Sequence, residues 1–348
     1  MSSNTRVVVK SGEEKENLLD SVLEESNFFE ILDKRLAETK KSQDQFLIAI
    51  KPNIMMGYSK RDPSTITDPS LVEHLVDKII EKGYTNIAIV ESQNVFSNWF
   101  KNRDVTKVAD YFGYSSKNYR IVDLTKEKAK YDYKNRLGKH WVGPTWRDAD
   151  FRISFAKNKT HFSCYFTLTI KNLYGCTPLQ NKFKEYHKIR EFDWPTIEML
   201  KHFPCHYGLI DAFISADGIW GLKSDETPVD TETIIGGENI IAVEAVGAEK
   251  MGLNPVVSRI FNKAVDAFGL PEIERVGDLS EYENWRNVPP GMDKALDIGE
   301  EFYNISNLLG FISSDMDPYF EVRTIACFAQ ALRKLMVPLQ KVLSRMGF

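Results

Sequence analysis

Apolar segments of strand length alternate with amphipathic segments of helix length early in this chain. Phe46–Lys51 (FLIAIK) and Asn86–Ser92 (NIAIVES) are short apolar runs of the kind that fills a buried strand. Between them, Ser70–Gly83 carries apolar residues at helical spacing, and its last glycine suits a C-terminal cap. Asp68 and Pro69 precede this segment as N-cap and first helical residue. The strand–helix–strand order predicts parallel strands joined by right-handed crossovers.

The same alternation continues downstream. Val105–Gly113 is predicted as a helix that leads to a strand at Tyr119–Leu124, and Phe151–Lys157 (FRISFAK) is predicted as another strand. A second set of strand and helix patterns occupies residues 208–270. We therefore predict an α/β fold with one or more mostly parallel, doubly wound sheets and helices on both faces.

The pattern divides the chain near residue 275. The α/β core is predicted over 1–275, either as one unit or as two lobes of about 1–125 and 140–275. Thr125–Lys139 is highly charged and lacks apolar periodicity, which is typical of an exposed excursion or of a seam between lobes. Residues 276–348 are predicted to form a mainly helical C-terminal extension, kinked or divided at Pro338.

The charge balance excludes several classes of partner. The chain has 45 basic and 49 acidic residues, a formal net charge of -4, so it offers no excess of positive charge for nucleic acid. No apolar run reaches the ~20 residues that span a bilayer, and the N-terminus lacks an apolar core of signal-peptide length. We expect a cytoplasmic protein whose partners are neither nucleic acid nor membrane, and which is compatible with a homo-oligomer.

The cysteines show no metal-binding spacing. No CxxC pair occurs among Cys164, Cys176, Cys205 and Cys327. We therefore expect neither a zinc ribbon nor a ferredoxin-type iron–sulfur cluster. In a reducing compartment these residues are expected to be thiols that pack as small apolar side chains.

Ionisable side chains are spread through the otherwise apolar segment Lys157–His187. His161 follows a predicted strand, and Lys171 lies on a helix predicted to start near Tyr165. Such groups either face solvent or converge on a site, because an unpaired buried charge is costly. Ligands of open α/β sheets bind beyond the carboxyl ends of the strands, which favours a site here.

The candidate catalytic residues are His161, Lys171 and Lys159. An imidazole with a pKa near ~6.5 gives and takes protons at neutral pH. Lys171, if half-buried, would lose its proton more easily or form a covalent adduct.

Four residues are candidates for substrate binding. Lys51 ends one predicted strand, Asn53 follows it, and Glu91 ends the next strand. Asn172 completes the set beside the catalytic lysine. A lysine at a strand end beside a helix N-terminus suits a carboxylate or a phosphate. We predict that Lys51, Glu91 and His161 share the carboxyl edge of the sheet.

Several short motifs in combination resemble the domain-of-unknown-function 362 family. They are KPN at Lys51–Asn53, TDP at Thr67–Pro69, KTH at Lys159–His161, TLTIKNLYG at Thr167–Gly175, ADG at Ala216–Gly218, and Gly236–Pro255. The resemblance covers roughly Val7 to Gly277. The family often has Asp where this chain has Glu244. Its members often occur beside iron–sulfur modules, whose cysteines this chain lacks.

The spacing of His161, Lys171 and His187 is similar to that of the nickel-pincer lactate racemase family. The resemblance implies that His161 is the acid/base, that Lys171 carries a covalently attached pincer nucleotide, and that His187 ligates a metal. The glycine-rich surroundings and the neighbouring histidine of those enzymes are missing here.

The cofactor therefore stays open between a metal, a pincer-type nucleotide and neither. Positive charge near His187 favours an anionic ligand over a cation, and it comes from Lys182, Lys184 and Lys188.

Two functions fit these residues. The first is an enzyme that acts on a small carboxylate- or phosphate-bearing substrate by His-mediated acid/base chemistry, as in racemisation or epimerisation. The alternative is a non-catalytic binding or electron-transfer accessory protein on the same scaffold. The titrating histidines with Lys171 favour the enzyme, because anion binding alone needs no paired bases.

Overall fold

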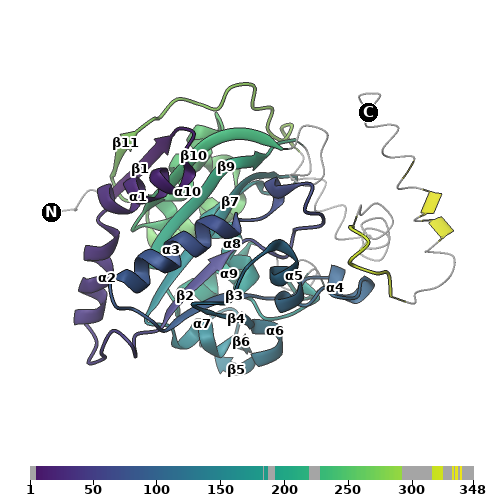
Figure 1. Ribbon diagram of the computed structural model, residues 1–348, viewed down its shortest axis with the longest axis horizontal. Coiled ribbons are helices and arrows are strands. Elements are labelled where there is room, and N and C mark those ends of the chain that lie inside the picture. The colour runs from purple at the N-terminus through teal and green to yellow at the C-terminus, as the bar shows by residue number, and fades with distance from the viewer. Residues whose placement is uncertain are drawn as a thin grey trace.

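A computed structural model describes residues 5–182, 184–186, 193–218, 228–291 and 316–323, with 331, 332, 334, 335 and 338. Within these ranges nine strands form one sheet, of which eight follow the order β11-β1-β10-β9-β7-β2-β3-β4 and β8 pairs with β7 (Figure 1). The bounds are β1 (Thr5–Ser11), β2 (Ile48–Pro52), β3 (Ile87–Glu91), β4 (Arg120–Asp123), β7 (Phe151–His161), β8 (Tyr165–Thr167), β9 (Tyr207–Ala216), β10 (Val229–Gly237) and β11 (Ile273–Gly277).

Most of the sheet is parallel. β9, β7, β2, β3 and β4 run in one direction, and β11 runs parallel to β1. β10 is antiparallel to both of its neighbours, and β8 is antiparallel to the end of β7. The predicted α/β class with a mostly parallel sheet is confirmed.

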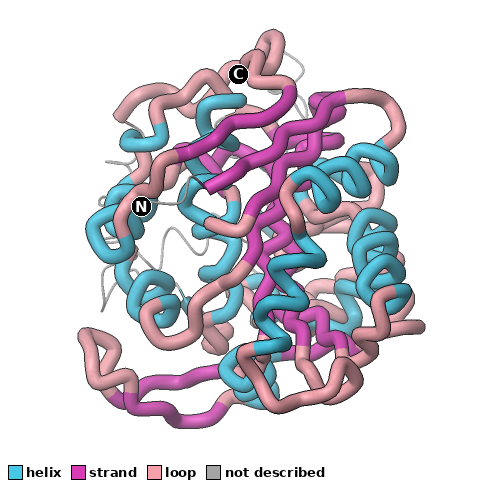
Figure 2. Tube along the Cα trace, turned by 90° about the vertical axis from the view of Figure 1, so that its left-hand side faces the viewer, coloured by secondary structure: helices cyan, strands magenta, loops and turns pink. Residues whose placement is uncertain are grey.

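Helices cover both faces of this sheet (Figures 1 and 2). One core forms against α1 (Lys15–Glu25), α2 (Phe28–Ala37), α3 (Pro69–Glu81) and α5 (Val105–Phe112). The cores on the other face include α7 (Pro144–Asp148), α8 (Thr169–Asn172), α9 (Trp194–Leu200), α10 (Ile240–Lys250) and α11 (Arg259–Phe268). Short helices α4 (Phe96–Trp99) and α6 (Leu124–Glu127) and the 3-10 turns η1 (Pro63–Thr65), η2 (Leu173–Cys176) and η4 (Pro255–Val257) complete the connections.

The two-sided cover explains the uninterrupted apolar runs in the sequence. Successive side chains of a strand point to opposite faces. In β2, Ile48 and Ile50 therefore enter the core on one face, and Ala49 enters the core on the other. A strand covered on both faces needs apolar residues at both sets of positions.

The predicted unit from β2 through α3 to β3 forms as expected. The Asp68 carboxylate accepts the backbone N–H of Ser70 at 2.9 Å, and Pro69 is the first residue of α3. Gly83 takes a left-handed φ of 93° just beyond the helix end. The two parallel strands then pair from Ile48 with Ile87 onward.

The helix predicted to start near Tyr165 is wrong at its beginning. β7 continues to His161, beyond the predicted end at Lys157, and turns into β8 (Tyr165–Thr167). The Cys164 N–H closes this turn on the His161 carbonyl at 3.2 Å. Aromatic and β-branched residues favour a strand where a neighbouring strand can pair with them, so Tyr165–Thr167 form a hairpin with β7 instead of a helix. Of the predicted helix, only α8 and η2 are helical.

Strand pairing joins the parts of the chain predicted, in one alternative, as two lobes. β7 lies between β2 and β9, so residues before 125 and after 140 share the same sheet. β1, β10, α1 and α2 were not predicted from the sequence. The charged segment Thr125–Lys139 contains β5 (Ala129–Asp132), which pairs with β6 (Lys139–Val142) as a separate antiparallel pair.

The predicted helical extension over 276–348 lies mostly outside the described residues. Pro338 is described but its immediate neighbours are not, so the kink or break expected there stays a prediction. The described residues 278–291 run without helix or strand, and the Asp217 carboxylate accepts the N–H groups of Arg286 and Asn287. Val322 bridges to Phe100 beside α4. In the described ranges, no helix is both long enough and apolar enough to cross a membrane.

The cap of α3 can be tested by substitution. Asp68 both caps the helix and accepts the Lys15 ammonium at 2.6 Å. Asp68→Ala should lower the free energy of unfolding by about 1–2 kcal/mol, because both interactions are lost. Asp68→Asn should cost less, since Asn also caps helices. Urea denaturation measures both losses, and equal losses would show that the cap contributes little.

Candidate functional site

A buried ion pair lies at the carboxyl edge of β2 and β3. The Lys51 ammonium donates to Glu91 Oε2 at 2.9 Å, and the two side chains are 1% and 5% exposed. Lys51 also donates to the Pro52 carbonyl at 2.6 Å and to Asn172 Oδ1 at 3.1 Å. These three acceptors match the three hydrogens of the ammonium group, so its orientation is determined.

The Asn172 amide connects this pair to the neighbouring strands. Its Nδ2 donates to the Lys51 carbonyl at 2.7 Å and to Ser154 Oγ at 3.1 Å. Its Oδ1 also accepts Asn53 Nδ2 at 3.4 Å. Asn172 thereby ties α8 to β2 and β7, and the structure brings it together with Lys51, Asn53 and Glu91.

Glycine at position 175 lets the chain pass directly over this ion pair. A Cβ at Gly175 would lie 2.3 Å from Glu91 Oε1 and 2.4 Å from Lys51 Cε. Neither atom can move far, because both side chains are buried and hydrogen-bonded. The contact was not predicted, and the glycine at the end of the KNLYG motif is the sequence feature that could have indicated it.

Lys159 enters the same site from β7. Its ammonium donates to two uncharged acceptors, Asn53 Oδ1 at 3.3 Å and the Thr65 carbonyl at 3.4 Å. Burial, together with the nearby Lys171 and Lys51 cations, lowers the pKa of Lys159 to about 7. Near neutral pH, this side chain exists both as the amine and as the ammonium ion.

Lys182 is a second lysine of this kind, to which the sequence assigned no separate role. It is buried and donates to the Gln93 carbonyl. Burial lowers its pKa to about 7; the Glu91 carboxylate opposes this shift, and the Lys51 cation adds to it.

Lys171 lies on α8 beside these groups and is half-buried. Its ammonium lies 4.5 Å from the centroid of the Tyr174 ring, a cation–π contact. Burial lowers its pKa; the Cys164 thiol acts in the opposite direction, and the Lys51 cation reinforces the decrease.

His161 is the last residue of β7 and is half-buried at the same edge. Its Nδ1 lies 3.4 Å from the Ser163 N–H and 3.1 Å from Ser163 Oγ. Because Nδ1 accepts the backbone N–H, the neutral imidazole carries its hydrogen on Nε2. Lys51, Glu91 and His161 thus all lie at or near the carboxyl ends of parallel strands, but β7 continues seven residues past Ser154, the partner of Lys51, so His161 lies farther along the strand direction than the ion pair.

Glu244 on α10 accepts hydrogen bonds from the first residues of α8. Its Oε2 accepts the Ile170 N–H at 2.7 Å and the Thr169 hydroxyl at 2.8 Å, which caps the start of α8. Burial raises its pKa to about 7. No role for this carboxylate was predicted, because its partner helix is more than 70 positions away in the sequence.

The predicted metal ligand His187 lies outside the described residues. Among the residues that are described, no group of three or more His, Cys, Asp or Glu side chains could hold a metal ion. Cys164, Cys176 and Cys205 are free thiols, and Cys327 lies outside the described part of the chain.

Chemically, the site combines ammonium groups, one paired carboxylate and an imidazole. The four lysines are Lys51, Lys159, Lys171 and Lys182. Two of them, Lys159 and Lys182 with a pKa of about 7, can exchange protons near neutral pH. Such a set can bind an anion and can move a proton.

One solved structure shows a weak likeness to this fold. It is described as the structure of the lactate racemase apoprotein from Thermoanaerobacterium thermosaccharolyticum, with a TM-score of 0.35 and 14% sequence identity. The match covers 68% of this chain and 54% of that chain, about half its length. A likeness at this level supports no conclusion about chemistry. No curated protein matches the sequence.

A family model covers more than half of the chain. The model described as "Domain of unknown function (DUF362)" matches residues 48–249, from the first strand of the predicted unit to the end of α10. This range holds all the described residues of the lysine site. The protein belongs to the DUF362 family.

Proposed function

We propose that this protein is an enzyme that binds a small carboxylate- or phosphate-bearing substrate at the carboxyl edge and moves a proton on it, as a racemase or epimerase does. The observation that carries the proposal is the excess of buried positive charge. Four lysines gather there: Lys51 pairs with Glu91, whereas the buried ammonium groups of Lys159 and Lys182 donate to uncharged oxygens.

An anionic substrate would supply the missing counter-charge. A buried ammonium group without a carboxylate is costly, and the depressed pKa values of Lys159 and Lys182 reflect that cost. An anion within reach would restore the protonated form of both. Besides Glu91, three carboxylates whose charge acts on these lysines have partners of their own: Asp62 accepts the Ser64 N–H, Asp123 accepts the Gln93 amide, and Asp193 pairs with Arg259.

Two groups are suited to the proton transfer. Lys159 and His161 are two positions apart on β7, so their side chains leave the strand on the same side, with Cα atoms ~7 Å apart. A substrate carbon beside the anionic group could lose its proton to one and receive a proton from the other. The donor and acceptor would then have exchanged protonation states, ready for the reverse reaction.

The roles of Lys171 as an attachment point and of His187 as a metal ligand stay predictions from the sequence. No step of the proposed reaction uses a metal or a covalent cofactor. The alternative, a binding protein without chemistry, needs the lysines but not His161.

The proton transfer is tested by exchange in D2O. We expect the wild type to exchange the proton beside the carboxylate in a panel of 2-hydroxy and 2-amino acids and their phosphorylated analogues, followed by NMR. His161→Ala and Lys159→Met should each lower the rate by at least ~100-fold, the usual size of an acid/base contribution, with little change in thermal stability.

The matched control is His74→Gln, a half-buried histidine on α3 that pairs with Asp20. It should leave exchange unchanged. A wild type that binds these anions but exchanges none of them would favour the binding-protein alternative. Stability losses well above ~1 kcal/mol in the site variants would mark those residues as structural.

The pH dependence of anion binding tests the lysines. Sulfate is the probe, because its charge is constant between pH 6 and pH 9. Lys159 and Lys182, with pKa values of about 7, are protonated below that pH and lose their charge above it. Sulfate affinity, measured by calorimetry, should therefore fall as the pH rises, by up to ~tenfold per unit for each proton taken up on binding.

Lys182→Met should flatten this pH profile, whereas Lys184→Met, an exposed lysine two positions away, should not. A profile of the wild type that is flat from pH 6 to pH 9 would rule out a role for the two lysines in anion binding. The stability of the ligand-free protein should change with pH in the opposite direction. Lysines in the unfolded chain keep their protons up to a pKa near ~10.4, whereas Lys159 and Lys182 lose theirs near pH 7 in the folded protein, so the free energy of unfolding should rise between pH 7 and pH 10.

Gly175→Ala tests the ion pair itself. The new methyl group would overlap Glu91 and Lys51, so we expect a loss of about 1–3 kcal/mol in unfolding free energy and a loss of sulfate binding. Chemical denaturation and calorimetry measure the two effects. Unchanged binding in this variant would mean that the anion does not depend on the geometry of the pair.

A further inference from the structure

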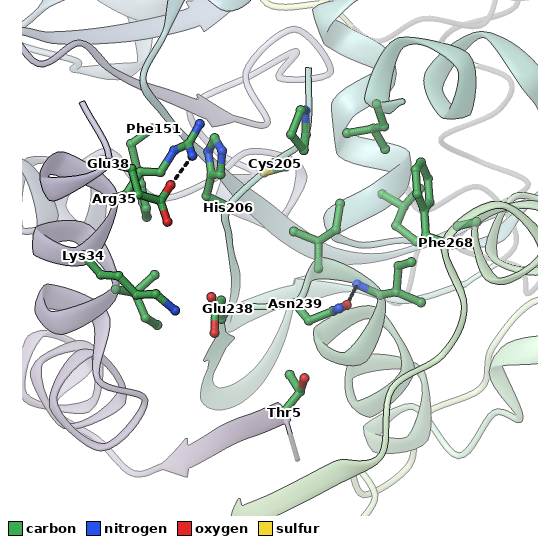
Figure 3. A pocket seen from close by; sticks show the side chains of 17 residues that line it. Thr5, Lys34, Arg35, Glu38, Phe151, Cys205, His206, Glu238, Asn239 and Phe268 are labelled. Atoms are coloured by element: carbon green, nitrogen blue, oxygen red, sulfur yellow. Dashed lines mark hydrogen bonds and ion pairs between the residues drawn. The ribbon is translucent and has the colours of Figure 1, made fainter. Parts of the chain in front are cut away.

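A cavity of about 500 Å³ lies at the opposite edge of the sheet, where β7 begins and β10 ends (Figure 3). Phe151, the first residue of β7, and Asn239, the N-cap of α10, line it. It shares no lining residue with the lysine site, which lies at the carboxyl ends of the same strands. Its volume is within the range of sites for small molecules, ~300–1,000 Å³.

The interior of this amino-edge cavity is apolar. Its lining includes side chains that the core buries completely or nearly so, from α8 to α11: Ile170, Leu200, Ile240, Ile241 and Ala264. Phe268 stands at its border and is 45% exposed, so an aromatic ring is available to a bound molecule. These groups favour a ligand that is mainly hydrocarbon.

One polar group of defined character faces the cavity. His206 Nδ1 accepts the Arg152 N–H at 2.9 Å, so the neutral ring carries its hydrogen on Nε2. Burial, together with the Arg152 and Arg35 cations, lowers the pKa of His206 to about 3. The imidazole is thus an uncharged donor at physiological pH, which suits an acceptor oxygen.

The charges around the cavity balance. Arg35 forms an ion pair with Glu38 one turn along α2 (Figure 3). Lys34 and Glu238 add one charge of each sign, and both side chains are exposed. Arg152 does not line the cavity, and its guanidinium donates to three backbone carbonyls. A charge on the ligand would find no excess of the opposite sign among the lining side chains, so an uncharged ligand is favoured.

We propose that the amino-edge cavity binds an uncharged, mainly apolar molecule about the size of two fused rings that carries a ketone or ester oxygen. The apolar walls hold the hydrocarbon body, and His206 Nε2–H donates to the oxygen. Ile170, which directly precedes Lys171 on α8, lies fully buried in the wall of the cavity. The inference does not depend on the proposed function at the carboxyl edge.

The probe is 6-propionyl-2-(dimethylamino)naphthalene, an uncharged naphthyl ketone whose emission shifts to the blue in apolar surroundings. Titrated into the full-length protein, it should bind with a Kd below ~100 µM, as expected for a ligand of its size. The same naphthalene without the ketone should bind about tenfold more weakly, the contribution of one hydrogen bond. The anionic 1-anilinonaphthalene-8-sulfonate should bind more weakly than the ketone.

Two exposed apolar residues give a matched pair of variants. Phe268→Ser removes an aromatic ring from the cavity border and should weaken binding at least ~fivefold. Leu270→Ser, two positions along the chain and 47% exposed, does not line the cavity and should leave binding unchanged. Ala264→Leu fills the interior and should weaken binding further, with folding checked by circular dichroism.

Three results would overturn the proposal. They are no blue shift in the wild type, equal effects of Phe268→Ser and Leu270→Ser, and tighter binding of the sulfonate than of the ketone. The first two would show that the cavity is not the binding site, and the third that its ligand is charged.

Discussion

The burial of ammonium groups at the carboxyl edge of the sheet is the constraint on which the site depends. The Lys51 ammonium is fully hydrogen-bonded, because a carboxylate, a backbone carbonyl and an amide oxygen accept its three hydrogens. A buried ion pair stabilises little in itself, but removing one partner costs several kcal/mol because the other charge is left alone. The Asn172 amide and the glycine at 175 are therefore parts of the pair, since the first orients it and the second makes room for it.

Lys159 and Lys182 are also buried, but they differ from Lys51 in their hydrogen-bond acceptors. Both donate to uncharged oxygens, and burial lowers the pKa of each to about 7. A protein that needed these side chains only for packing could use methionine or leucine at no electrostatic cost. Perturbed titrating groups gathered in one place are typical of functional sites, although structural networks also perturb them.

Helix α8 lies between the carboxyl-edge site and the wall of the amino-edge cavity. Lys171 and Asn172 on α8 belong to the carboxyl-edge site, and Ile170 lines the amino-edge cavity. Glu244 of α10 holds the start of α8 through the Ile170 N–H. A short helix of one turn has little stability of its own, so its position depends on these contacts. The wall of the cavity therefore includes part of the element that carries Lys171.

The sequence by itself determined the elements whose signals are local. The apolar run of β2, the Asp68 cap and periodic apolar face of α3, and the run of β3 predicted a parallel unit, because each signal acts within a few residues. The order of these elements also placed Lys51, Glu91 and His161 at strand ends, and hence at one edge. Only the tertiary structure decided which distant residues meet, such as Asn172 with Lys51 across 121 positions and Glu244 with Ile170 across 74. It also decided that Tyr165–Thr167 form β8 instead of a helix, and that β1 joins β10 at the far side of the sheet. Periodicity describes one segment at a time, whereas pairing and burial depend on the partner that the rest of the chain supplies.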